Sequence, residues 1–281
     1  MCRKMMSIVA IAGVVLALGA PGQADLIGYW GFEDNLTESS GYAQTAAGGS
    51  KAAGFYDGEV AAGAIAYSAG AVGKCLDLTG GDNAVQVKNS DTLSSIFEFG
   101  DHIKVDFTIA FWVKGWPGDS TDYGLVTRGF TDGGNHGMGV GVKSSSDNIT
   151  FKLGDKSDPT TGDDLGDANW HHVAVVVNAT TLQMLSYIDG DLAGTMDIDE
   201  FGNYYYRDSN PGGDEAYIVF GADQSGEDVA LTSFAKLPLD EIRIYNEALS
   251  ETAVGALVPE PATMSLLALG GLAMIRRRRR A

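Results

Sequence analysis

The sequence predicts an all-β protein whose body, residues 25–257, folds as a two-sheet antiparallel sandwich. Short runs of alternating or continuous apolar residues recur along this body, separated by clusters of Gly, Asp, Asn and Ser. Almost no segment keeps a helical period for ten residues, which favours a sandwich or barrel. The body is of a length that suits one large all-β domain, and it shows neither an internal repeat nor a second domain boundary.

The clearest predicted strand covers residues 107–114. Four apolar side chains, Phe107, Ile109, Phe111 and Val113, fall on one face, and the residues between them fall on the other. Because successive side chains of a strand point to opposite faces, this period of two indicates a strand with one face in the core.

A β-meander is predicted further along the body. Its strands are the apolar or alternating runs 172–177, 184–188 and 192–196. The dipeptide Asp189-Gly190 separates the last two runs, and it suits the positive φ angles of a tight hairpin turn.

One helix and three long loops complete the predicted body. The helix covers residues 250–257, where Ser250 can cap the first turn and Glu251 lies near the positive end of the helix dipole. The loops are Gly/Ala-rich or Asp-rich and cover residues 42–71, 155–169 and 203–215. Loops of this size on a rigid sandwich are where binding specificity is commonly carried.

Charge and motif content exclude several classes of function. The chain has 19 Lys and Arg against 37 Asp and Glu, and residues 25–258 alone carry 12 basic and 36 acidic residues. A body this acidic repels phosphate backbones, so no nucleic-acid partner is predicted. The two cysteines, Cys2 and Cys75, provide no zinc-type cluster, and the sequence contains no HExxH, GxSxG or P-loop motif.

Residues 1–24 form a predicted secretory signal peptide. Arg3 and Lys4 precede an apolar stretch from Ile8 to Ala20, and small residues stand before Asp25, where signal peptidase would cleave. The alternative, an uncleaved N-terminal anchor, is less favoured because the apolar run is short for a bilayer span of about 20 residues.

The C-terminal segment, residues 258–281, has three parts. It contains Pro259-Glu260-Pro261, then an apolar run to Ile275, then five arginines and a final alanine. The positive-inside rule holds such an arginine cluster at the cytoplasmic face. These parts in this order resemble the PEP-CTERM sorting signal. The resemblance implies a bacterial exported protein, processed at the membrane by an exosortase-type transpeptidase that recognises Pro259, Glu260 and Pro261.

The apolar stretch 261–275 predicts a C-terminal helix that contacts the membrane, transiently or stably. Its 15 residues span roughly 22 Å as a helix, against about 30 Å for a bilayer core. Snorkelling arginines can make up the difference, or the helix is a transient stop before processing. An ordinary tail anchor would need a longer apolar segment. The sequence leaves open whether the tail is cleaved.

Seven strings in the body carry a second resemblance, because they follow one another in the order found in the laminin-G-like or concanavalin A-like jelly roll. This resemblance covers nearly all of the body and implies the jelly-roll form of the predicted sandwich. The strings are residues 29–33, 73–78, 84–87, 107–114, 170–174, 187–190 and 239–245.

Asp240 opens the apolar run 240–245. Ile242 and Ile244 must face the core, so a period of two places Asp240 on the same inward side. A carboxylate in such a place must be paired, capped by N–H groups or bound to a cation.

The family resemblance implies one structural calcium ion near Asp240. In the resembled family the matching Asp commonly helps to hold calcium, and here Glu33 is the candidate acidic partner, with a carbonyl near Gly73 as a further oxygen ligand. The alternative is that Asp240 accepts hydrogen bonds from loop amides and binds no metal.

Two other groups of polar residues have simpler interpretations. An acidic loop contains five aspartates without the spacing of an EF-hand, so a solvated surface is favoured over a second calcium site. His171 and His172 point to opposite faces of one strand and therefore cannot share a metal ion, so both are predicted to be structural. The five aspartates are Asp155, Asp158, Asp163, Asp164 and Asp167.

Aromatic residues in or near the predicted loops suggest a sugar-binding surface. Exposed aromatic rings stack on the apolar faces of sugars while neighbouring polar groups bind the hydroxyls. The alternative is that these rings only cover the edge of the sandwich. The candidates are Trp116, Tyr123, Tyr204, Tyr205 and Tyr206.

Glycoside hydrolysis is weighed because the resembled fold also occurs in laminarinase-like enzymes. Such enzymes use alternate carboxylates of a Glu-x-Asp-x-Glu strand on both sides of the scissile bond. The nearest string is Asp197-Ile198-Asp199-Glu200, in which Glu200 falls on the opposite face from the two aspartates. The sequence therefore predicts no enzyme.

These observations predict a non-catalytic protein of the bacterial cell surface or extracellular matrix. It would be exported with the help of signal peptidase, sorted by an exosortase-type system, and used for adhesion to a polysaccharide or a surface protein. The alternatives are a secreted glycan-active hydrolase and a purely structural envelope component.

Overall fold

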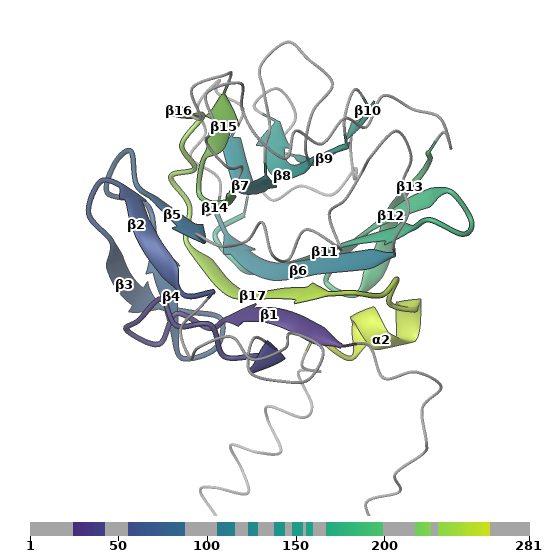
Figure 1. Cartoon of the computed structure of the whole chain (residues 1–281), viewed down its shortest axis with the longest axis horizontal. Helices are drawn as coiled ribbons and strands as arrows, with labels where there is room; N and C mark the ends of the chain where they lie inside the picture. Colours follow the sequence, from purple (N-terminus) through teal and green to yellow (C-terminus); the bar gives the residue numbers. More distant parts are fainter. Residues whose placement is uncertain are drawn as a thin grey trace, which may run out of the picture.

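The computed structural model describes most of the body as two layers of β-strands. The described residues are 25–42, 56–87, 106–115, 123–128, 138–143, 148–153, 156–159, 167–198, 217–225 and 230–258. In this part of the chain two large antiparallel sheets pack face to face, and one short helix lies outside them (Figure 1). The predicted all-β sandwich is confirmed. The predicted signal peptide and the residues from Pro259 onward lie outside the described residues.

Sheet A is the eight-stranded layer of the described residues, at the lower side of Figure 1. Its strands are β1 (Leu26–Trp30), β3 (Ala66–Ala69), β4 (Lys74–Asp77), β6 (Phe107–Lys114), β11 (Trp170–Asn178), β12 (Gln183–Ile188), β13 (Asp191–Asp197) and β17 (Leu239–Tyr245). The order across the sheet is β13-β12-β11-β6-β17-β4-β3, and β1 also pairs with β17.

Sheet B is the opposite layer, with seven strands among the described residues. They are β2 (Gly58–Ala62), β5 (Ala84–Val87), β7 (Tyr123–Arg128), β8 (Met138–Lys143), β9 (Asn148–Leu153), β10 (Lys156–Pro159) and β14 (Ile218–Phe220), in the order β10-β9-β8-β7-β14-β5-β2. Strands β15 (Asp223–Ser225) and β16 (Ala230–Thr232) form a small separate ribbon. Strands β4 to β7 alternate between the two sheets, as in a jelly roll.

The core lies between the sheets and is filled by alternate side chains of their strands. The four side chains predicted to face inward from β6, Phe107, Ile109, Phe111 and Val113, are all buried in it. The fully buried Trp30 meets Phe220 of sheet B edge to face, with ring centroids 5.1 Å apart. Contacts of this kind hold the two layers together.

The predicted meander is confirmed as β11, β12 and β13. These strands are antiparallel neighbours at one edge of sheet A. The turn residues Asp189 and Gly190 have φ angles of 51° and 89°, as the prediction of a tight hairpin required.

The predicted loops are wrong in part. Strands β2 and β3 lie inside the stretch 42–71, and β10 lies inside 155–169. The pairing of β2 with β5 and of β3 with β4 explains the first difference, because a neighbouring strand can hold a Gly/Ala-rich segment extended. The third predicted loop, 203–215, lies outside the described residues.

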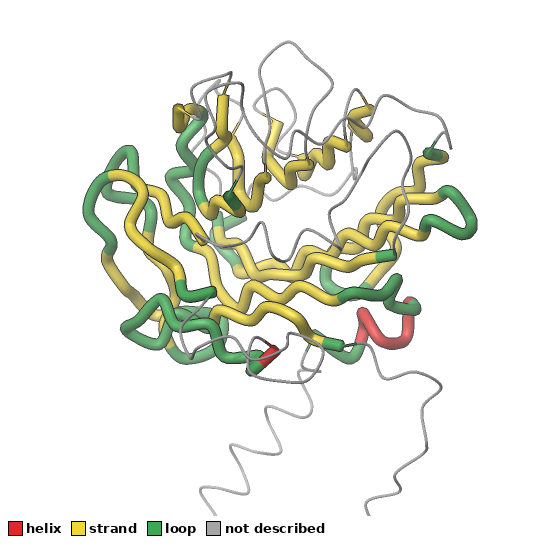
Figure 2. The backbone as a smooth tube through the Cα atoms, in the orientation of Figure 1, coloured by secondary structure: helices red, strands yellow, loops and turns green. Residues whose placement is uncertain are grey.

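The predicted helix is present as α2 (Glu251–Gly255), the red segment at the lower right of Figure 2. As predicted, Ser250 caps it, and the Ser250 hydroxyl accepts a hydrogen bond from the Ala253 amide at 3.3 Å. Helix α2 packs on the outer face of sheet A, the face that points away from the core. There Val254 joins a small apolar cluster with Ala110, Ala174, Val176 and Tyr187.

Candidate functional site

Strand β17 contains a β-bulge that changes the side on which Asp240 lies. Asp240 pairs with Trp112 and Arg243 pairs with Ala110, so one extra residue stands on β17 between these two pairs. Glu241, within the bulge, has a φ of 52°. Leu239 therefore faces the core, while Asp240 shares the outer face with its partner Trp112. The prediction that Asp240 lies on the inward side with Ile242 was wrong, because the bulge breaks the period of two.

Asp240 is nevertheless fully buried, beneath the loop 70–73 that joins β3 and β4. Its Oδ2 atom accepts a hydrogen bond from the Val72 amide at 3.0 Å, and its Oδ1 atom accepts one from the Glu241 amide at 2.8 Å. Burial raises the pKa of Asp240 to about 7, and the charge of Glu241 acts in the same direction, although the amide bonds favour the ionised carboxylate. Amide capping, the alternative given for Asp240 from the sequence, is therefore present.

The same loop receives a second carboxylate, that of Glu33. Its Oε1 atom accepts a hydrogen bond from the Lys74 amide at 3.2 Å. A Cβ atom on Gly73, whose φ is +62°, would lie 1.8 Å from this oxygen, and one on Gly70 would lie 2.5 Å from Asp240 Oδ2. The structure thus brings the three predicted metal-site residues, Glu33, Gly73 and Asp240, to one loop, and the absence of side chains on its glycines is what lets the carboxylates approach.

The chemistry of this group suits a hard cation. Its possible ligands are carboxylate and carbonyl oxygens, which calcium prefers. The Lys74 carbonyl oxygen and Asp240 Oδ2 both lie within 3 Å of the position that a Gly70 Cβ would take, so both oxygens border the space beside Gly70. Among the described residues no three His, Cys, Asp or Glu side chains gather into a metal-binding group. A calcium ion held by Glu33 and Asp240 would therefore depend on backbone oxygens for its remaining ligands.

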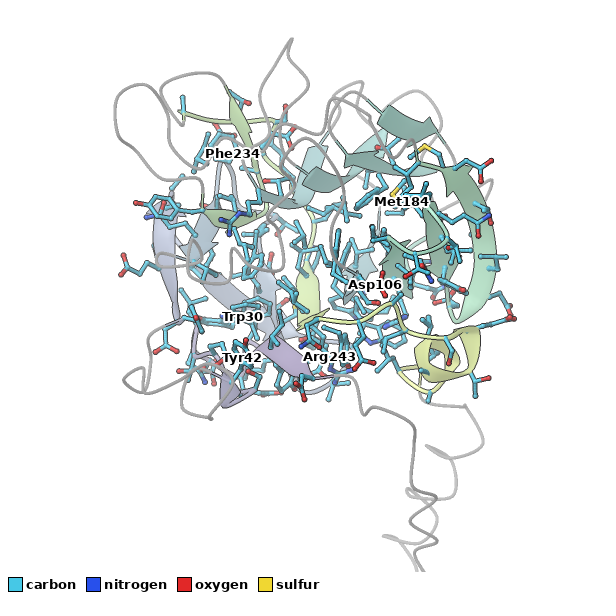
Figure 3. All side chains as sticks on the ribbon, turned by 45° about the vertical axis from the view of Figure 1, so that its right-hand side comes forward. Trp30, Tyr42, Asp106, Met184, Phe234 and Arg243 are labelled. Carbon is cyan, nitrogen blue, oxygen red and sulfur yellow. The ribbon has the colours of Figure 1, made fainter. Side chains whose placement is uncertain are left out.

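A second polar group on the outer face was not predicted from the sequence. The Tyr29 hydroxyl donates to Glu241 Oε1 at 2.7 Å, Arg243 forms an ion pair with the same carboxylate, and the guanidinium carbon lies 5.1 Å from the Tyr29 ring centroid. Burial, together with the bond to Glu241, raises the pKa of Tyr29 to about 12. Arg243 is labelled beside β1 in Figure 3. The sequence does show polar side chains within the two apolar strands β1 and β17. It does not show that these two strands pair.

The two adjacent histidines take separate structural roles. His172 is buried on the outer face, with its ring 5.3 Å from that of Trp112, and burial lowers its pKa to about 4. His171 lies between two carboxylates, with Nε2 2.9 Å from Asp167 and Nδ1 2.9 Å from Asp189. Of the aspartates in the predicted acidic loop, Asp167 is therefore engaged in a protein contact.

Four of the five predicted sugar-binding aromatic residues lie outside the described residues. This holds for Trp116 and for Tyr204, Tyr205 and Tyr206; Tyr123 begins strand β7, but its side chain is not among those described. Of the carboxylates weighed for hydrolysis, Asp197 is exposed at the end of β13, whereas Asp199 and Glu200 are outside the described part. The sugar-binding hypothesis remains a prediction.

The fold and the sequence together identify the class of protein. The chain belongs to the concanavalin A-like lectin/glucanases superfamily, whose sequence model matches residues 79–255. The PEP-CTERM protein-sorting motif matches residues 257–280. Both resemblances found in the sequence are confirmed. The sorting motif indicates export, sorting to the surface and processing by an exosortase.

Solved structures similar to this chain include several binding domains. Domain 4 of AbnA, an extracellular GH43 arabinanase from Geobacillus stearothermophilus, in complex with arabinotriose, has a TM-score of 0.56 and 18% identity over 85% of this chain and 100% of that domain. The binding domain of Paraclostridial Mosquitocidal Protein 1 has a TM-score of 0.56 and 20% identity over 83% of this chain and 52% of that one.

A third similar structure is that of botulinum neurotoxin type C, whose cell entry is described as dependent on two ganglioside molecules. Its TM-score is 0.54, with 17% identity over 84% of this chain and 50% of that one. This chain therefore spans about half of each toxin chain but the whole of the arabinanase domain. At these identities the likeness shows the fold alone. No curated protein sequence matches the chain.

The described residues contain no helix that is long and apolar enough to cross a membrane. The predicted C-terminal apolar helix, residues 261–275, lies outside them.

Proposed function

We propose that this chain is an exported, non-catalytic binding protein of the bacterial surface or extracellular matrix, whose jelly roll contacts a polysaccharide. The observation that carries the proposal is the combination of a concanavalin A-like body with a PEP-CTERM motif on one chain. Two similar structures support the choice of ligand class. The arabinanase domain was solved in complex with arabinotriose, and cell entry of botulinum neurotoxin type C is described as dependent on two ganglioside molecules.

The contacts of four described carboxylates support a non-catalytic role. A retaining glycosidase needs two carboxyl groups about 5 to 5.5 Å apart, free to act on the scissile bond. Here Asp240 and Glu33 accept hydrogen bonds from backbone amides. Glu241 accepts a hydrogen bond from Tyr29 and forms an ion pair with Arg243. Glu38 accepts hydrogen bonds from the amides of Tyr29 and Ser40. Carboxylates used in this way hold loops and strands together. They are poorly placed to act as acid and nucleophile.

We place the polysaccharide contact on the aromatic residues Trp116, Tyr123, Tyr204, Tyr205 and Tyr206. Stacking on aromatic rings recognises a sugar without consuming it, which suits adhesion. We also propose that Glu33, Asp240 and a carbonyl near Gly73 hold one calcium ion. Its contribution would be structural, because it would fix the loop 70–73 on the outer face of sheet A.

A glycan array tests the proposal directly. The mature protein should bind a defined set of glycans, and replacing all three of Tyr204, Tyr205 and Tyr206 by alanine should remove most of the signal. Tyr67→Ala, a change to a half-buried aromatic residue on β3, is the matched control and should keep it.

The array also separates the alternatives. Loss of a glycan over time, with release of reducing ends, would indicate the hydrolase instead. Binding to no glycan with the fold intact would indicate a structural envelope component. Repeating the array with calcium and with chelator shows whether the ion contributes to binding.

A further inference from the structure

The sorting motif begins inside the folded body. The motif match starts at Leu257, whereas the described fold continues through Val258. Pro259, the first residue of the Pro-Glu-Pro sequence, thus follows directly on a residue that still has protein contacts, and no linker separates the two. The contacts of the last few described residues therefore decide how easily the motif can be reached.

Helix α2 fixes this end of the body on sheet A. Val254 is fully buried in the apolar cluster formed with Ala110, Ala174, Val176 and Tyr187, and Leu257 packs against the same cluster. Thr108 of β6 anchors the connection to the helix, since its hydroxyl donates to the Glu247 carbonyl at 2.7 Å and accepts from the Leu249 amide at 3.0 Å.

The last two described residues are held in a turn. The Leu257 amide donates to the Val254 carbonyl at 3.0 Å, and the Val258 amide donates to the Gly255 carbonyl at 3.2 Å. Val258 also lies beside the β12–β13 turn, since its Cγ2 atom is 3.6 Å from the position that a Cβ on Gly190 would take. The backbone that leads into the sorting motif is therefore held in hydrogen-bonded turns and packs against the body.

A peptide that is bound by strand addition to the edge of a sheet must be extended over several residues, and we infer that the processing enzyme binds the sorting motif in this way. Residues 257 and 258 cannot be extended while their amides close turns onto α2. We propose that docking of α2 on sheet A is an autoinhibitory contact, and that the sorting motif becomes a substrate when this helix detaches. The inference depends on the sorting part of the proposed function and is independent of sugar binding.

The size of the contact makes such control feasible. Helix α2 has five residues, of which only Val254 is fully buried, so it belongs to the parts of the fold that open locally at modest free energy. When opening and closing are fast compared with cleavage, the cleavage rate follows the population of the open form. Changes that weaken or strengthen α2 should then change processing in opposite directions.

The experiment follows processing of the full-length chain by pulse-chase and intact mass, in a bacterial host that contains the exosortase-type enzyme. Val254→Ala, which removes the buried anchor, should speed processing about tenfold. Six Gly/Ser residues inserted between Val258 and Pro259 should speed it as well. Gly255→Ala adds a Cβ that meets no atom within 4 Å and favours the helix, so it should slow processing about threefold.

Controls separate this inference from the proposed function. The same six residues inserted between Gly80 and Gly81, in the connection between β4 and β5, should leave the rate unchanged. Hydrogen exchange at the amides of Leu257 and Val258 should become faster in Val254→Ala and slower in Gly255→Ala. Equal processing rates in the parent, Val254→Ala and linker variants would overturn the autoinhibitory contact alone. If neither the parent chain nor any variant is processed, the sorting role is overturned as well.

Discussion

The two ends of the outer face of sheet A are covered in different ways. At one end α2 lays Val254 onto an apolar cluster, and at the other the loop 70–73 closes over the carboxylates of Asp240 and Glu33. Apolar contact is nondirectional and scales with buried area, whereas a buried carboxylate needs each of its partners in place. Substitutions at the α2 end should therefore cost little stability, and this end should open easily. Substitutions at the 70–73 end should cost much more stability.

Adding one methyl group to a glycine should show the largest contrast. Gly73→Ala places a Cβ 1.8 Å from Glu33 Oε1 at a φ of +62°, so we expect a loss of about 3 kcal/mol in the free energy of unfolding. Gly255→Ala, in α2, meets no atom within 4 Å and should be neutral or stabilising. Urea denaturation measures both. Equal effects at the two positions would contradict the distinction.

Removing one oxygen from the buried carboxylate should have the next largest effect. In Asp240→Asn an amide NH₂ replaces one of the two oxygens that now accept backbone N–H groups, which should cost about 2 kcal/mol. The exposed Asp82→Asn is the matched control and should change stability by less than about 0.5 kcal/mol. If the two variants unfold at the same urea concentration, the amide cap contributes nothing to stability.

Calcium should stabilise only the 70–73 end. With a Kd of about 10⁻⁴ to 10⁻³ M, typical of extracellular modules, a tenfold excess would add about 1.4 kcal/mol. The measurement is the melting temperature with added calcium and with chelator. Val254→Ala should keep this response and Asp240→Asn should lose it. A melting temperature that neither reagent changes would remove the calcium proposal.

The smallest effect is expected at the turn that borders α2. Burial opposes protonation of His171, but the bonds to Asp167 and Asp189 outweigh it and raise its pKa. A raised pKa stabilises the fold below the unfolded value of about 6.5, and this contribution is lost as the pH rises through the folded value. Because the site is partly solvated, we expect less than about 1 kcal/mol. Melting temperatures from pH 5 to pH 9 should fall less in His171→Asn than in the parent chain.

Much of the sandwich could be predicted from side-chain alternation. Strand β6 and the β11–β13 meander have clear patterns because one face of each packs on the core. Strands β2 and β3 could not be found in this way, because their small residues extend only by pairing with β5 and β4. Long-range pairing of this kind leaves no local signal.

The candidate site was predictable by family resemblance and not by periodicity. Resemblance pointed to Glu33, Gly73 and Asp240, and the structure brings all three to one loop. Periodicity gave the wrong side for Asp240, because the β-bulge at Glu241 interrupts the alternation. A glycine would have suggested such a positive φ angle in the sequence, but a glutamate does not. The Tyr29–Glu241–Arg243 group was missed for a related reason, since it depends on which strand lies beside β17.

The extra residue in β17 also bears on how relatives of this chain should be aligned. An alignment without gaps assumes that side chains alternate regularly from Leu239 to Ile244. It would therefore place the core residue Leu239 in the same column as outer-face residues of relatives without the bulge. Opening a one-residue gap at Glu241 restores the hydrophobic columns. A homologue that lacks this residue would have a straight strand, in which the acidic residue still lies on the outer face opposite the position of Trp112.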